Sequence, residues 1–254
     1  HYKSTMPIEL ILSPIMRPVV LAKSLLFAPH RRSSRYIPHI IQLDEANCSR
    51  YAIRRRFGTG SKIFDVYDTK EEGSGPSGPT EQSKSLFWFV RSRAVKGAYK
   101  MYSNAIRATG PNGEDEPCAT LRAGLRSNVL LIRAPEAPVA ELGWHVISHR
   151  VDALDAYRMF TLADGATYQW TTKGKYLERV KNVGEKESEV RERIGQVVPA
   201  AASGFDLIVD DTKIPREMAL ASALCSFIDH WNTNIDVGGI YYARQPRHVR
   251  WKRD

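Results

Sequence analysis

The segment from Pro215 to Trp231, PREMALASALCSFIDHW, constrains the fold more than any other part of the chain. No residue between Met218 and Phe227 is charged, and large apolar side chains lie all around the helix that this segment predicts. Such a helix is buried on every side, and this one is too short to cross a bilayer. Other elements must therefore surround it. We expect its core-forming residues to be Met218, Leu220, Leu224, Phe227, Ile228 and Trp231.

Most of the preceding sequence consists of short β-branched or aromatic stretches separated by turn residues. Many short strands at this spacing predict a barrel or a sandwich. The absence of a strand–helix alternation and of a glycine-rich phosphate loop disfavours Rossmann and P-loop enzymes. The predicted strands cover residues 37–43, 51–57, 62–67, 86–91, 98–103, 105–108, 119–123, 129–134, 140–148, 157–162, 166–171, 176–180, 193–198 and 205–209.

The net charge of +9 is concentrated toward the two ends of the sequence. Residues 1–57 carry a net charge of +7 and residues 240–254 carry +4, whereas residues 58–239 carry −2. We therefore divide the chain into a basic, proline-punctuated arm (1–36), a single β-rich domain (37–240) and a basic aromatic tail (241–254). The Gly/Ser/Pro-rich stretch 71–85 predicts a mobile loop within the domain.

Candidate catalytic and metal-binding groups carry weak signals. His145 and His149 fall on a predicted strand, where residues four apart are about 13 Å from each other, too far to share one metal. Asp210 and Asp211 precede the helix, where local turn hydrogen bonds are the favoured role. The three cysteines, Cys48, Cys118 and Cys225, have no metal-ligand spacing, and Cys225 lies inside the apolar helix. We expect no cofactor, no metal and no enzymatic activity, although an enzyme with an unrecognised site stays an alternative.

Three stretches carry a resemblance to a known superfamily. They are YRMFTLADGATYQW at 157–170, GKYLERV at 174–180, and FDLIVDDTKIPREMALASALCSFIDHW at 205–231. On these, the chain resembles the tubby C-terminal-like superfamily of tubby-like proteins, phospholipid scramblases, LURP-one-related proteins and small fungal members. The resemblance implies a closed antiparallel β-barrel around a buried C-terminal hydrophobic helix. A β-sandwich with one packed helix is the alternative.

Two groups of basic residues stand out as candidate anion-binding sites, and animal tubby domains bind phosphoinositides. The first group is the run Arg54, Arg55 and Arg56. The second comprises Lys173, Lys175 and Arg179, which alternation on a barrel strand would direct to one surface patch. Such patches suit a phosphoinositide head group, which accepts charge-assisted hydrogen bonds. A solvated surface balanced by nearby acids is the alternative for the second group.

These observations lead to expectations about partners and location. The favoured function is a non-enzymatic tubby-like domain that binds anionic phospholipid or a protein partner. The alternative is a nucleic-acid-binding protein that uses its basic termini, where Tyr241, Tyr242 and Trp251 alternate with arginines. We expect an intracellular protein without a transmembrane segment, either cytoplasmic or peripheral to a membrane. The composition of the N-terminal arm also fits a mitochondrial address.

Overall fold

The computed structural model divides the chain into two compact units. One of them is Pro38–Tyr242, and a large part of it is described below. The described residues are 38–56, 62–69, 85–95, 97–105, 115–124, 127–135, 137–152, 154–185, 188–200 and 204–231. The expected arm 1–36, the tail 241–254 and all but the last residue of the expected loop 71–85 lie outside them.

The fold is mainly β. The first strands are β1 (His39–Ile41), β2 (Ser49–Arg55), β3 (Ile63–Asp68), β4 (Phe87–Arg91), β5 (Ala98–Ser103), β6 (Ala119–Arg122) and β7 (Asn128–Leu131). The later strands are β8 (Gly143–Val146), β9 (Ser148–Val151), β10 (Ala156–Thr161), β11 (Thr167–Thr171), β12 (Tyr176–Lys181), β13 (Val190–Ala200) and β14 (Gly204–Val209). Two single-turn 3₁₀ helices, η1 (Glu45–Asn47) and η2 (Val139–Glu141), interrupt them.

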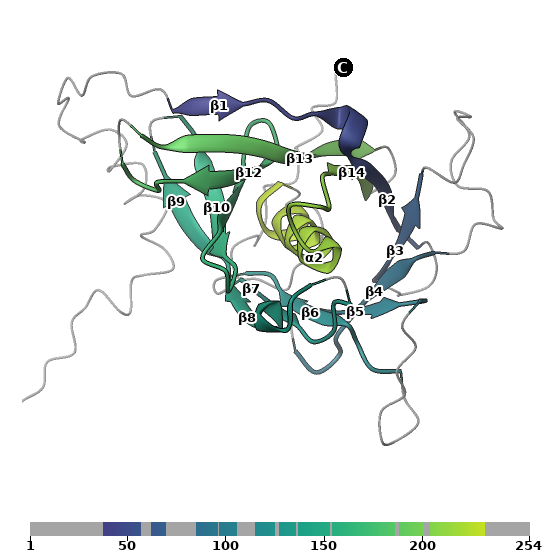
Figure 1. Ribbon diagram of the computed structural model, residues 1–254. Helices are drawn as coiled ribbons and strands as arrows, with labels where there is room; N and C mark the ends of the chain where they lie inside the picture. The colour runs from purple at the N-terminus through teal and green to yellow at the C-terminus, as the bar shows by residue number, and fades with distance from the viewer. Residues whose placement is uncertain are drawn as a thin grey trace, which may run out of the picture. The chain divides into compact units, whose positions relative to one another are not determined.

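The strands β2 to β14 form a nearly closed antiparallel barrel (Figure 1). The strands from β2 to β8 and from β9 to β14 pair with their neighbours in sequence, and β14 returns to pair with β2. The seam lies between β8 and β9, which are joined through Ile147 alone. β1 lies outside this path and pairs in parallel with β13. The prediction of a β-barrel is confirmed, and the sandwich alternative is wrong.

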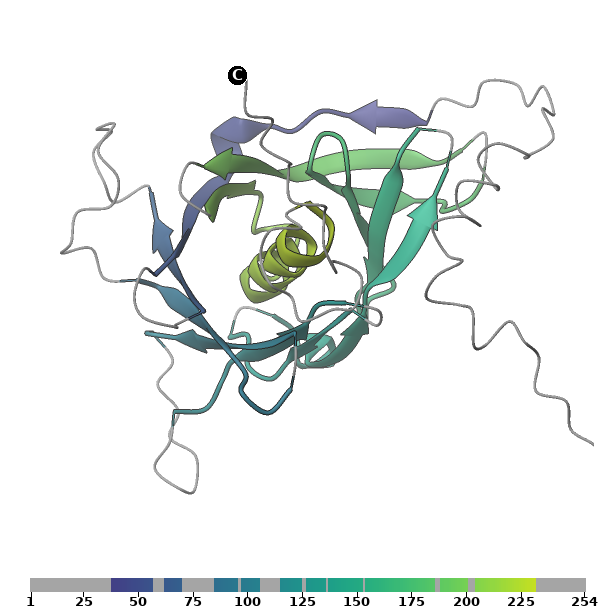
Figure 2. The same cartoon turned by 180° about the vertical axis from the view of Figure 1, so that it is seen from behind.

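The helix α2 (Arg216–Ser226) and its π-helical continuation η3 (Phe227–Trp231) lie inside the ring of strands in both views (Figures 1 and 2). Every α2 residue after Arg216 is buried, as the all-round apolar sequence predicts. Of the core-forming residues that we expected, Trp231 alone keeps partial exposure. One wall–helix hydrogen bond runs from Trp170 Nε1 to Ser222 Oγ, at 3.0 Å.

Alternation along the strands directs one set of side chains onto this helix. On β4 and β5, Phe87, Phe89, Tyr99 and Met101 face inward and are buried, whereas the residues between them are at least partly exposed. Each large apolar side chain buried in this way contributes roughly 1.5–3 kcal/mol. The helix and the inward residues thus form one core.

The strand predicted at 140–148 is divided in the structure. Its start belongs to η2, where buried Glu141 accepts hydrogen bonds from the backbone N–H groups of Ala163 and Asp164. β8 begins only at Gly143, whose φ of 134° is a conformation that favours glycine. Of the strand predicted at 105–108, Ala105 is not in a strand and the rest lies outside the described residues.

Candidate functional site

The arginine run at the end of β2 is largely paired within the barrel wall. Arg54 Nη2 donates to Asp206 Oδ1 on β14 at 2.5 Å. Arg56 makes two hydrogen bonds to Asp65 on β3, of 2.9 and 2.5 Å. The run has no acid near it in sequence, but the neighbouring strands supply two. The carboxylates partly neutralise the arginines with which they pair, so these arginines attract an anionic ligand less strongly.

Arg55 points to the other side of the same strand. Alternation places it on the inner side with Ile53, and its cross-strand neighbour is the core residue Phe64. It therefore lies at an end of the barrel and is separated from the outward pair formed by Arg54 and Arg56.

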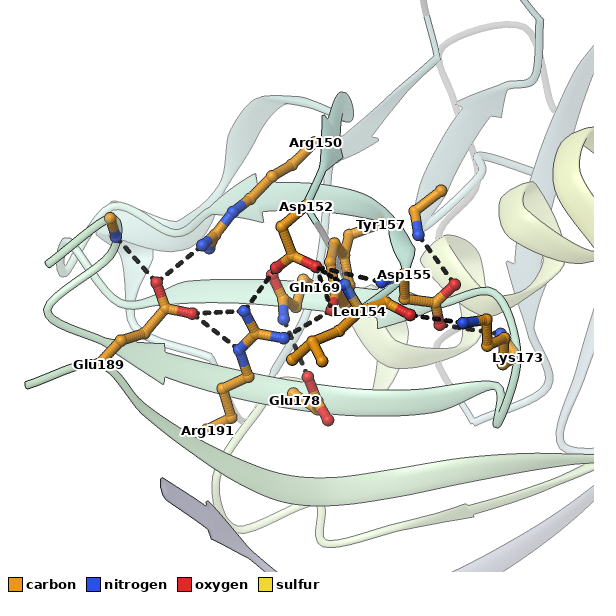
Figure 3. Close-up of polar contacts among 12 residues, drawn as sticks. Arg150, Asp152, Leu154, Asp155, Tyr157, Gln169, Lys173, Glu178, Glu189 and Arg191 are labelled. Atoms are coloured by element: carbon orange, nitrogen blue, oxygen red, sulfur yellow. Dashed lines mark hydrogen bonds and ion pairs between the residues drawn. The ribbon is translucent and has the colours of Figure 1, made fainter. Parts of the chain in front are cut away.

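The second predicted group does not form one patch. Arg179 is directly opposite the core residue Tyr168, so it shares the inner side of the wall. Lys173 Nζ donates to the carbonyl of Leu154 at 2.6 Å, and Figure 3 shows it beside the β9–β10 connection. Lys175 instead lines a small cavity at one end of the barrel. These three predicted ligands thus lie in three different environments.

A different surface emerges on the five adjacent strands β4 to β8, most of which lie along the lower side of Figure 1. None of these strands contains an aspartate or glutamate. Lys100 and Arg122 are exposed there, and neither has an ion pair among the described residues. We call the outward-facing side chains of these strands the acid-free wall. Its strands contribute positive charge and no negative charge.

Large apolar side chains are exposed at the β8 edge of this wall. Val139 is 82% exposed, Trp144 66%, Val146 68% and Leu142 37%. Between Trp144 and Val146, His145 faces inward and is buried, so strand alternation holds the two apolar side chains outward. We call these four residues the apolar ridge. Apolar side chains clustered and exposed in this way mark interaction surfaces.

The strand register connects the apolar ridge to the cations. Trp144 is opposite Leu130, which is opposite Thr120, which in turn is opposite Lys100. Three strand spacings, about 14 Å, therefore separate Trp144 from Lys100. Farther along the wall, the rings of Trp88 and Tyr102 stack with centroids 5.3 Å apart. Aromatic, aliphatic and cationic groups thus share one outer surface.

The wall on the other side of the seam, formed by β9 to β13, contains a buried cluster of paired charges. Arg191, 2% exposed, donates to Glu189 Oε1 at 2.7 Å, to the Tyr157 hydroxyl at 2.6 Å and to Asp152 Oδ2 at 2.7 Å (Figure 3). Its guanidinium also lies 4.9 Å from the centroid of the Tyr157 ring. Arg150 adds a 2.7 Å hydrogen bond to Glu189. We call these five residues the Arg191 cluster.

The titration behaviour of the Arg191 cluster fits a closed structural network. Burial raises the pKa of Asp152 and Glu189, but hydrogen bonds from Arg191 and from backbone N–H groups outweigh it, so both pKa values lie below their usual range. Burial raises the pKa of the Tyr157 hydroxyl. The carboxylates of the cluster are therefore ionised and paired, and the cluster itself has little charge to offer a ligand.

A second buried arginine lies inside the barrel. Arg158 on β10 pairs with Asp229 of η3, which also accepts a 2.9 Å hydrogen bond from Ser127 Oγ. Burial raises the pKa of Asp229, and Arg158 Nε has no partner among the described residues. This ion pair fastens the end of the helix to the wall, a contact across 71 residues that sequence patterns did not reveal.

The other candidate residues have structural roles. His145 Nε2 lies 2.8 Å from the Glu141 carbonyl oxygen, and His149 contacts Arg158. Asp210 accepts hydrogen bonds from the backbone N–H and hydroxyl of Thr212, which confirms the predicted turn role. Among the described residues no group of three or more His, Cys, Asp or Glu side chains is placed to hold a metal.

The three cysteines are buried and unpaired with one another. Burial raises the pKa of the Cys118 and Cys225 thiols to about 12, and also raises that of Cys48. Thiols in this state are poor nucleophiles, as the position of Cys225 in the apolar helix predicts.

Comparison of the chain with protein-family models, with curated proteins and with solved structures gave no match. In the part of the chain that the structure describes, no helix has both the length and the hydropathy needed to cross a membrane.

Proposed function

We propose that the chain is a non-enzymatic tubby-like domain that binds the surface of anionic phospholipid membranes through the acid-free wall and its apolar ridge. The antiparallel barrel around a buried late helix supports the tubby-like assignment. One observation carries the binding proposal: four large apolar side chains are exposed beside a wall whose strands contain cations and no acid.

The chemistry of this surface matches a membrane interface. Tryptophan favours the head-group level of a bilayer, where its ring is partly buried and its N–H stays hydrated. Full burial of a valine or leucine side chain is worth roughly 1.5–3 kcal/mol, so the ridge can supply several kcal/mol on partial insertion. Lys100 and Arg122 would each add about 1 kcal/mol near an anionic surface. Binding is therefore expected to be reversible and to weaken as salt increases.

This proposal moves the predicted lipid contacts from the sites that the sequence suggested. Arg54 and Arg56 are paired with Asp206 and Asp65, and Lys173 donates to a backbone carbonyl. Lys100 and Arg122 have no such carboxylate partners among the described residues. Binding of a ligand by Arg54, Arg56 or Lys173 would require existing hydrogen bonds to be broken. Binding by Lys100 or Arg122 would not.

Vesicle flotation tests the proposal directly. We expect the protein to float with phosphatidylcholine vesicles that contain phosphatidylserine or a phosphoinositide, and to remain unbound with phosphatidylcholine alone. Trp144→Ser should weaken binding by roughly tenfold, and the double variant Lys100→Gln/Arg122→Gln, which loses about 2 kcal/mol, by roughly thirtyfold. Equal binding to phosphatidylserine and to phosphoinositide at matched charge would indicate a surface rather than one head group.

Matched variants outside this surface provide the controls. Val183→Ser removes an apolar side chain that is 41% exposed, and Lys181→Gln removes an exposed cation of β12. Val183→Ser should leave flotation unchanged. Lys181→Gln should reduce it only slightly, through the loss of one charge distant from the proposed surface. Equal effects of the two sets of variants would contradict the proposal. Salt-sensitive binding to single-stranded RNA without vesicle binding would do the same and would support the nucleic-acid alternative.

A further inference from the structure

A buried histidine connects the strand of the apolar ridge to a strand on the other side of the seam. Among the described strands, β8 pairs with β7 alone, and it lies in contact with β10. His145, 6% exposed, faces inward between Trp144 and Val146. Its Nδ1 lies 3.3 Å from the carbonyl oxygen of Thr161 on β10, and its Nε2 lies 2.8 Å from that of Glu141 in η2. One imidazole ring therefore bridges the two sides.

Both neighbours of this ring are hydrogen-bond acceptors. A carbonyl oxygen can only accept, and a neutral imidazole has one N–H and one nitrogen without a proton. In either tautomer, the neutral ring can bond to one of the two carbonyls and directs a lone pair toward the other. The imidazolium has two N–H groups and can bond to both. A carbonyl oxygen beside each nitrogen of His145 therefore fits the charged form of the ring.

The elements around His145 can accommodate a positive charge. Glu141 of η2 and Asp164 of the β10–β11 turn are acidic, and the Asp164 N–H donates to the Glu141 carboxylate. β7 contributes no charged residue, and neither does α2 after its first turn. The other charged or titratable groups on the inner side are Arg158 of β10, Asp229 of η3, Arg179 of β12 and His149 of β9. Arg158 and Asp229 form an ion pair with each other, so the two acids near His145 remain to balance the ring.

We propose that protonation of His145 regulates membrane binding by the apolar ridge, so that binding strengthens as the pH falls from about 8 to about 5.5. This inference rests on the function proposed above. The imidazolium fixes the ridge strand to β10 through two hydrogen bonds, and the neutral ring keeps only one of them. A ridge that is already held in place loses less conformational freedom at the membrane interface, so it binds more tightly.

Vesicle flotation at about pH 5.5 and about pH 8 tests the regulation, with phosphatidylcholine vesicles that contain phosphatidylserine. We expect the parent protein to bind roughly threefold more tightly, or better, at the lower pH. His145→Gln keeps an N–H donor that does not titrate, so its affinity should be nearly equal at both pH values. His39→Gln removes an exposed histidine of β1, outside the acid-free wall, and should keep the pH dependence of the parent.

A measurement on the parent protein keeps the proposal testable if His145→Gln does not fold. In an NMR spectrum of the ring nitrogens, His145 should have two protonated nitrogens at about pH 5.5 and one at about pH 8. The regulation is overturned if the ring has the same protonation state at both pH values, or if the two histidine variants show the same pH dependence of flotation. Flotation of the parent that does not change with pH would overturn the regulation alone. No flotation at either pH would overturn the membrane proposal and the regulation with it.

Discussion

The two walls that meet at the β8–β9 seam differ in whether their characteristic side chains are buried with partners or exposed to solvent. Around Arg191, the β9–β13 wall encloses a guanidinium, two carboxylates and a phenol in one hydrogen-bonded cluster. The acid-free wall leaves Trp144, Val146, Lys100 and Arg122 exposed to solvent. Charge that is buried with its partners stabilises the fold, whereas exposed groups without partners are available to another molecule. Substitutions should therefore affect stability on one wall and binding on the other.

The largest expected effect is the loss of Arg191. Arg191→Met leaves the buried carboxylate of Glu189 and the partly exposed carboxylate of Asp152 without their shared cation, and this should lower the free energy of unfolding by about 3–5 kcal/mol. Urea denaturation monitored by circular dichroism measures the change. The matched substitution on the acid-free wall, Arg122→Met, should stay within about 0.5 kcal/mol of the parent protein. Similar losses for the two variants would contradict the distinction between the walls.

The same comparison can be made on the helix with two serines. Ser222→Ala removes the acceptor of the buried Trp170 N–H and should cost about 1–3 kcal/mol. Ser226→Ala removes a buried hydroxyl that has no partner among the described residues, so stability should be unchanged or slightly higher. Thermal unfolding of the two variants side by side measures the difference. A larger loss for Ser226→Ala would show that its hydroxyl has a role that the structure does not display.

The Arg191 cluster also predicts how stability depends on pH. Because the folded pKa values of Asp152 and Glu189 lie below their ordinary values of 3.8 and 4.5, their contribution is fully present above those values. This contribution is lost as the pH falls through the lower folded pKa values of the two carboxyl groups. Asp229, whose pKa is raised by burial, contributes in the opposite direction, since its stabilisation is lost as the pH rises through its folded pKa.

Variants of the cluster separate these contributions. Glu189→Gln should flatten the acid limb of a plot of unfolding midpoint against pH, because one depressed carboxyl group no longer titrates. Asp115→Asn, which removes an exposed carboxyl group outside the cluster, is the matched control. An acid limb that is equally steep in the parent and in Glu189→Gln would mean that Glu189 does not contribute to it.

Local sequence patterns predicted much of the fold because the interactions behind them are local. The uncharged stretch from Met218 to Phe227 has no polar face to present to solvent, so burial of the helix follows from composition alone. Alternation and turn residues likewise located most strands within a few residues. The division of 140–148 was missed because it depends on Glu141, whose hydrogen-bond donors come from a turn more than twenty residues later.

The residues of the proposed binding surface were harder to predict because charge pairing is set by strand register. Arg54 is neutralised by Asp206, 152 residues away, and no sequence window brings them together. The lack of acids in the segments that became β4–β8 was visible in the sequence, but their adjacency was not. The signal that was overlooked is the alternation of Trp144 and Val146 around His145, which places two large apolar side chains on the solvent side of a strand.

Trp144 combines a small expected effect on stability with the largest effect on binding that we expect of a single residue. Trp144→Ser removes a side chain that is 66% exposed and whose main cross-strand neighbour is Leu130. Such a pair contributes roughly 0.2–1 kcal/mol, so the free energy of unfolding should fall by no more than about 1 kcal/mol. Urea denaturation and vesicle flotation on the same preparation measure both quantities. A loss of several kcal/mol would place Trp144 in the core of the protein and would remove the reason to regard the apolar ridge as a surface for another molecule.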